Sequence, residues 1–190
     1  MKITEIKCLV STDESTGHNL AYVKTLTDEG IHGVGEVYHV GPDMASPYWV
    51  QYFEEQLKGQ NPMEIERNWA LCYQGARFPI GSSGLAALSA IDQSLWDITG
   101  KAFDKPVYEL FGGRVRDKIR AYFDIHGDTP EQLAEDARLN VDKGFTALKA
   151  SPLSPMWREM RWNDALADAR ERFKAVRSAI GDYIDVGFDA

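Results

Sequence analysis

The chain has 190 residues, of which 44% are hydrophobic, enough to bury one large core or two small ones. Its formal net charge of −8 argues against nucleic acid or an anionic membrane surface as the main partner. An acidic chain can still bind an anionic substrate, because a metal ion or a lysine sets the local field in a pocket. No run of about 18 apolar residues is present and Met1 leads directly into a strand-like segment, so we expect a soluble, cytoplasmic protein.

The first forty residues show the alternating side-chain pattern that is typical of an antiparallel β-meander. The pattern predicts strands that begin at Ile3 and that cover 20–26 and 31–40, with a turn at 28–30. Between the first two strands lies the polar loop "STDESTGHN", residues 11–19. The loop is either a solvated hairpin end or a mobile flap over a pocket. The two cysteines lie among apolar neighbours without C-x-x-C spacing, which favours buried thiols over a disulfide or a zinc pair.

Helical spacing follows the meander. It predicts helices over 48–57 and 63–73, a long helix from Ser82 to Gly100, and a short one within "KPVYELFGG". Asp92 falls on the apolar stripe of the long helix. A carboxylate at such a position is expected to be buried, hydrogen-bonded and structural rather than catalytic.

From Lys118 onward, strands and helices alternate. Strands are predicted at 119–125, 145–150 and 186–188, and helices at 129–144 and 163–180. Thr129 is the expected N-cap of the first of these helices, with Pro130 at its first position. Strands that are apolar throughout and separated by helices are typical of parallel βαβ units.

A polar group follows each of these three strands. The first ends in Asp124-Ile125-His126, the second in Lys149-Ala150-Ser151 and the third in Asp189. Parallel βα barrels carry their chemistry at the C-terminal ends of their strands, so the three groups form a candidate site. An aspartate there can hold Mg²⁺ through oxygen. A lysine can hold a substrate carboxylate, or act as a base if its pKa is lowered.

The segment "ALSAIDQSLWDITGKAFDKPVYELFGGRVRDKIRAY", residues 87–122, closely resembles the domain junction of the enolase superfamily in its mandelate racemase and muconate lactonizing branch. The resemblance extends over all 190 residues. It implies an α+β capping domain over 1–117, followed over 118–190 by the first three strands and two helices of a modified (β/α)₈ barrel. It also implies a barrel that binds Mg²⁺ and that abstracts a proton α to a carboxylate. The metal stabilises the enediolate that results.

The resemblance assigns roles to particular residues. Asp189 matches the first of three carboxylate metal ligands, and Lys149 matches the first lysine of a Lys-x-Lys motif. The second lysine, the usual base in racemases and cycloisomerases, is replaced here by Ser151. This departure counts against both of those reactions and is similar to acid-sugar dehydratases of the galactonate type.

In those dehydratases the base is a histidine–aspartate pair on later strands. The acid is often a histidine two residues after the metal aspartate, which is the position after Ala190. His126 is therefore expected to contact substrate or to be structural rather than catalytic. The loop 11–19 and the segment 41–49 resemble the two lid segments of the family, which makes His18, Tyr48 and Trp49 candidate substrate contacts.

These observations predict the N-terminal portion of a Mg²⁺-dependent acid-sugar dehydratase in which Lys149 and Ser151 act on the substrate and Asp189 binds the metal. A complete barrel needs about 250 residues, so we expect these 190 residues alone to be catalytically silent. The alternatives are a racemase, epimerase or other member of the same branch, and a non-catalytic scaffold that kept the fold. The expected partners are a small sugar acid and further copies of the same chain in a homo-oligomer.

Overall fold

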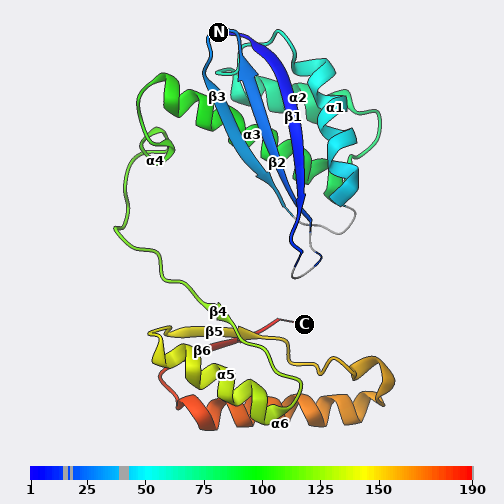
Figure 1. Ribbon diagram of the computed structural model, residues 1–190, viewed down its shortest axis with the longest axis vertical. Helices are drawn as coiled ribbons and strands as arrows, with labels where there is room; N and C mark the ends of the chain where they lie inside the picture. Colours follow the sequence, from blue (N-terminus) through cyan, green and yellow to red (C-terminus); the bar gives the residue numbers. More distant parts are fainter. Residues whose placement is uncertain (15–16, 18, 39–42, 190) are drawn as a thin grey trace. The chain divides into compact units, whose positions relative to one another are not determined.

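A computed structural model describes residues 1–14, 17, 19–38 and 43–189 (Figure 1). The chain divides into two compact units, Met1–Val115 and Arg116–Ala190. The sequence places the boundary after residue 117. Within the described residues, no helix combines the length and the apolar character needed to cross a membrane.

The first unit contains a three-stranded antiparallel sheet in the order β1 (Ile3–Thr12), β2 (Asn19–Thr27), β3 (His32–Val37). The predicted meander is confirmed. The ladder between β2 and β3 ends where Ala21 pairs with Val37. The third strand is therefore shorter than the predicted 31–40, and residues 39 and 40 lie outside the described part of the chain.

Helices cover one face of this sheet (Figure 1). They are α1 (Ser46–Leu57), which follows the short 3-10 turn η1 (Asp43–Ala45), then α2 (Ile65–Gly75), α3 (Gly81–Ala102) and α4 (Val107–Leu110). The unit's apolar core lies between the sheet and α1, α2 and α3, and Val23, Phe53, Leu57, Ala87 and Ile98 are among its fully buried members.

The contact between β3 and α3 requires glycine. A Cβ on Gly33 or Gly35 would stand 1.9 Å from a backbone oxygen of α3, so only glycine lets the strand and the helix approach this closely. Helix α3 also supplies a hydrogen-bond acceptor to the outer edge of β3, because the backbone N–H of Val34 donates to Asp97 Oδ2 at 2.9 Å. Helix α3 therefore protects a strand edge that would otherwise be open to pairing with another chain.

The sequence predicted burial for Asp92 and for the two cysteines of this unit. Asp92 is half-buried rather than buried, because its place on α3 lies at the margin of the apolar stripe. Burial raises the pKa of its carboxyl, nearby Glu66 raises it further, and a hydrogen bond with the Trp96 side chain lowers it. Cys8 and Cys72 are free thiols, as predicted, but only Cys72 is buried, while Cys8 is half-buried. Burial raises the pKa of Cys72 to about 12.

The second unit is a parallel sheet in the order β4 (Phe123–Asp124), β5 (Ala147–Ala150), β6 (Asp185–Phe188). The strands are connected by α5 (Pro130–Asp142) and α6 (Trp162–Ile180), with the 3-10 turn η2 (Trp157–Glu159) before α6. Both helices lie on the same face of the sheet (Figure 1). Such an arrangement begins a (β/α)₈ barrel, in which helices cover only the outside. The predicted order, an antiparallel sheet with covering helices followed by parallel βα units, is confirmed.

The strand predicted at 119–125 is wrong in its extent, because only Phe123 and Asp124 pair with β5. Ile119 is 86% exposed and belongs to no strand. The side chain of Arg120 provides the cross-strand bonds at this level. It donates to Thr146 Oγ1 at 2.9 Å and Thr146 O at 2.6 Å, and pairs with Asp185 Oδ2 at 2.5 Å. A side-chain clamp thus joins the N-terminal ends of the three strands in place of a longer backbone ladder.

The two faces of this small sheet differ in character. Leu148 and Ala150 of β5 are buried in an apolar cluster with Ile125 and the inward residues of α5 and α6, Leu133, Ala137 and Val176. Side chains alternate along a strand, so the residue between them, Lys149, lies on the opposite face. No helix of the second unit covers that face (Figure 1).

Candidate functional site

The helix-free face of the second unit collects the charged groups at the strand ends. In the parallel register Asp124 is the partner of Lys149, and Lys149 is the partner of Gly187. Residues in register on neighbouring strands point to the same face, and Asp189 follows Gly187 by two positions. The topology therefore places Asp124, Lys149 and Asp189 together although they lie far apart in the sequence.

The Lys149 ammonium is the centre of this cluster. Its Nζ lies 3.3 Å from Asp124 Oδ1 and 3.3 Å from Asp189 Oδ2. The ring centroid of Tyr122 is 5.5 Å away, within cation–π range. Hydrogen bonds to Asp189 and then to Asp124 raise the pKa of Lys149. The sequence left open a base of lowered pKa here, and the two neighbouring carboxylates shift the pKa in the opposite direction, because they favour the charged form.

Space remains beside this lysine. A Cβ added to Gly187 would meet, among the described residues, only the backbone oxygen of Leu148 at 3.9 Å. The glycine thus leaves the sheet surface next to Lys149 free of a side chain. A small anionic ligand could contact the ammonium there without displacing protein atoms.

A hard cation is the metal that the donor chemistry suits. Asp189 ends β6 with a carboxylate that is 70% exposed, and oxygen is the ligand that Mg²⁺ prefers. The described part of the chain contains no group of three histidine, cysteine, aspartate or glutamate side chains arranged to hold a metal. The residues therefore fit a site to which this chain contributes one ligand, Asp189.

His126 and Ser151 both line a separate pocket of about 180 Å³ between the loops that follow β4 and β5. Both residues are exposed. The Ser151 hydroxyl is engaged by its own loop, since the backbone N–H of Leu153 lies 3.3 Å from Oγ. The structure therefore brings His126 and Ser151 to one pocket and Lys149 and Asp189 to one cluster, on consecutive strand ends of the same unit.

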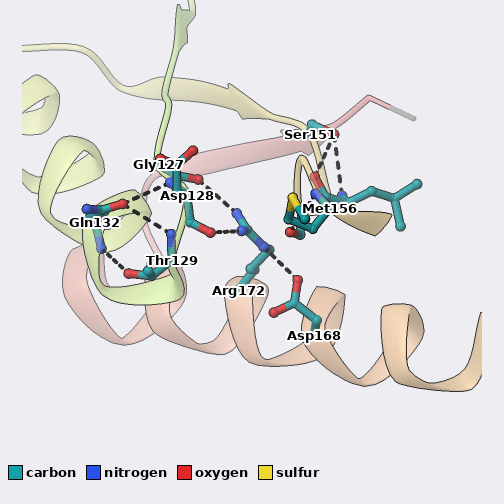
Figure 2. A network of polar contacts seen from close by, with 10 residues as sticks. Gly127, Asp128, Thr129, Gln132, Ser151, Met156, Asp168 and Arg172 are labelled. Carbon is teal, nitrogen blue, oxygen red and sulfur yellow. Dashed lines mark hydrogen bonds and ion pairs between the residues drawn. The ribbon is translucent and has the colours of Figure 1, made fainter. Parts of the chain in front are cut away.

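Sequence reasoning missed Arg172, which forms part of the wall of this pocket. It lies on α6, is 2% exposed and is held by Asp168 four residues earlier, with 2.9 Å between Nε and Oδ2. Figure 2 shows its guanidinium directed at the loop that follows β4. An aspartate and an arginine four residues apart were the available signal, but that spacing is common on exposed helix faces.

The remaining candidates belong to the first unit. Tyr48 is 76% exposed, whereas Trp49 is half-buried and stacks on Phe53 with 5.8 Å between ring centroids. Trp49 Nε1 also donates to Ser83 Oγ at 3.2 Å. Tyr48 and Trp49 line an aromatic pocket of about 490 Å³ together with Tyr52, Phe78 and other residues of 76–79. His18 lies outside the described residues.

Comparison with known proteins agrees with this architecture. The model of the mandelate racemase / muconate lactonizing enzyme N-terminal domain matches residues 6–112. A D-galactonate dehydratase of Verminephrobacter eiseniae is 33% identical over all of this chain and 48% of its own length. One from Variovorax paradoxus is 36% identical over 88% of this chain and 44% of its own length. The chain thus spans about half the length of the curated relatives it matches.

Solved structures give the same result. An enolase from Agrobacterium radiobacter, crystallised with Na⁺ and L-malate bound, superposes with a TM-score of 0.87 at 34% identity. The alignment covers 100% of this chain and 48% of that one. A mandelate racemase/muconate lactonizing enzyme from a Sulfitobacter species gives a TM-score of 0.88 at 31% identity, covering 100% and 53%.

Proposed function

Since the chain belongs to the mandelate racemase / muconate lactonizing enzyme family, we propose that it serves in the dehydration of a sugar acid, started by removal of the proton α to the carboxylate. The observation that carries the proposal is the Lys149–Asp189 pair on the helix-free face of a barrel-like sheet, with Ser151 where the family's racemases have a second lysine. The relatives named D-galactonate dehydratase support the substrate class.

Lys149 is proposed to bind the substrate carboxylate and to balance the negative charge that grows as the α-proton leaves. The raised pKa keeps the ammonium charged at neutral pH, which suits this role and not that of a base. Asp124 would retain the ammonium at the strand end while Asp189 engages a cation, because each carboxylate reaches Nζ independently.

Asp189 is proposed to hold Mg²⁺. When bound, the ion would supply positive charge beside the substrate carboxylate and so lower the cost of the enediolate. Ser151 and His126 would contact substrate hydroxyls from the pocket between their loops. Tyr48, Trp49 and His18 are proposed as further substrate contacts on the strength of the resemblance alone.

The reaction breaks the Cα–H bond and then the C–O bond of the β-hydroxyl, which leaves as water. We propose that the base and the acid of these steps come from polypeptide outside these 190 residues. Within the described cluster both carboxylates, Asp124 and Asp189, are paired with Lys149, so neither is placed to act as the base. The 190 residues alone should therefore be inactive.

The test is a screen of hexonates and hexarates with the complete gene product, with and without Mg²⁺, in which formation of a 2-keto-3-deoxy acid is followed. Asp189→Asn is expected to lower kcat/KM by about 100-fold or more and to weaken Mg²⁺ binding. Asp182→Asn is the matched control, because this exposed carboxylate lies in the turn between α6 and β6, at the other end of the strand that leads to Asp189. Equal losses in both variants would contradict the assignment of the metal to Asp189.

A further inference from the structure

We infer that Arg172 is a positioning residue that fixes the loop carrying His126 and that it acts on substrate binding through that loop. It lies on α6, while the loop consists of residues 126–129 between β4 and α5. The kinetic part of this inference rests on the proposed function. The structural part stands on contacts within the second unit.

The guanidinium donates hydrogen bonds to the loop from both of its terminal nitrogens. Nη1 donates to the carbonyl oxygen of Gly127 at 3.0 Å, and Nη2 donates to the carbonyl oxygen of Asp128 (Figure 2). Nε donates to Asp168 Oδ2 at 2.9 Å, so the buried charge keeps a counterion. A planar fork of donors can serve three acceptors at once, whereas a lysine ammonium reaching the same depth cannot match this geometry.

The same two peptide groups are held from the other side by α5. The backbone N–H groups of Asp128 and Thr129 both donate to Gln132 Oε1, at 3.0 and 3.2 Å. Gln132 is itself part of a capping box, in which its backbone N–H donates to Thr129 Oγ1 (Figure 2). Each peptide plane therefore has its oxygen fixed by α6 and its nitrogen fixed by α5.

His126 is fixed by its neighbours in the same way. Its backbone N–H donates to Asp136 Oδ2 at 2.9 Å, and the next carbonyl, that of Gly127, is one of the two held by Arg172. Gly127 packs directly against the start of α5 and leaves no room for a side chain, because a Cβ there would lie 2.4 Å from the backbone nitrogen of Leu133. The backbone at His126, from which the imidazole projects, is thus held by contacts with both α5 and α6.

Amide hydrogen exchange on the full chain tests the structural part with Arg172→Lys. The amides of Asp128 and Thr129 are expected to exchange about tenfold faster, while amides of β5 and α6 stay protected. Arg177→Lys is the matched control, since Arg177 on the same helix donates to the carbonyls of Gly181 and Ile184 at 2.7 and 2.8 Å. It should leave the amides of Asp128 and Thr129 unchanged. Unchanged exchange of these two amides in Arg172→Lys, or a uniform rise across the second unit, would overturn the inference.

A double-mutant cycle in the complete enzyme tests the kinetic part. Arg172→Lys is expected to raise KM for the sugar acid about fivefold with little change in kcat, and this effect should vanish when His126 is already alanine. The same rise in KM in both backgrounds would show that Arg172 acts by another route. If the enzyme turns over no sugar acid, the proposed function fails, and the exchange measurement still decides whether Arg172 positions the loop.

Discussion

Two adjacent residues of β5 should respond to mutation in opposite ways. Leu148 is 2% exposed and packs in the apolar cluster between the sheet, α5 and α6. Leu148→Ala removes buried methyl groups and leaves a cavity in a small core, so it should lower the free energy of unfolding by about 2–5 kcal/mol. Because Leu148 lies on the helix side of the sheet, the fraction that remains folded should keep its kcat.

Lys149→Met should leave the stability nearly unchanged and lower the activity. The lysine is on the opposite face, and the side chains of its partners Asp124 and Asp189 are 49% and 70% exposed. Both 3.3 Å distances exceed the roughly 2.7–2.9 Å of strong charge-assisted hydrogen bonds. Exposed ion pairs of this kind add little to stability, so the urea midpoint should stay near that of the wild type. The charge that would balance the enediolate is lost, however, and kcat/KM should fall by about 100-fold or more.

The assay pairs urea titrations of the two variants with steady-state kinetics on the complete gene product. Lys143→Met is a suitable control lysine, since its ammonium contacts Asn140 Oδ1 and the Phe123 ring away from the cluster. The reasoning would be refuted if Lys149→Met lowered the urea midpoint as much as Leu148→Ala, because Lys149 would then hold the sheet together rather than face a ligand.

Three further outcomes are expected. Burial raises the folded-state pKa of the Asp92 carboxyl above its ordinary value of about 3.9, so its contribution to stability is complete below that value and is lost as pH rises through the folded pKa. Asp92→Asn should therefore raise the urea midpoint at pH 7. A pH series in which the midpoints of the variant and the wild type fail to converge in acid would refute this. Cys72, with its pKa near 12, should react with a thiol reagent at pH 8 only after unfolding, and rapid reaction in the native state would contradict its burial. Thr129→Ala should cost about 1 kcal/mol by removing the capping box of α5, as measured by thermal unfolding, and a neutral result would mean that the Thr129 hydroxyl adds nothing to helix stability.

Local patterns predicted much of the fold. The sequence Thr129-Pro130 gave both the start of α5 and its N-cap, because these residue types satisfy helix ends without tertiary help. The strand at 119–125 was predicted too long. Its apolar residues suggested burial, yet Ile119 is 86% exposed and the side chain of Arg120 replaces the backbone pairing. Such a replacement depends on the neighbours Thr146 and Asp185, which a local pattern does not reveal.

The site was predictable as a set of strand ends but not as a set of contacts. Parallel topology brings Asp124, Lys149 and Asp189 to one edge, and this follows from alternating strands and helices. That Lys149 bonds both carboxylates depends on strand register, which no single segment encodes. Arg172 was missed because its role consists of bonds to backbone carbonyls of a distant loop. Carbonyl acceptors are present in every residue and so leave no mark on the sequence.

The most direct test of the proposed chemistry is a proton NMR measurement of the complete gene product with D-galactonate in D₂O containing Mg²⁺. The account predicts loss of the α-proton signal together with appearance of a 2-keto-3-deoxy acid, and neither change in Lys149→Met. Exchange of the α-proton for deuterium or inversion at that carbon, without loss of the β-hydroxyl from any sugar acid tried, would contradict dehydration and would favour an epimerase.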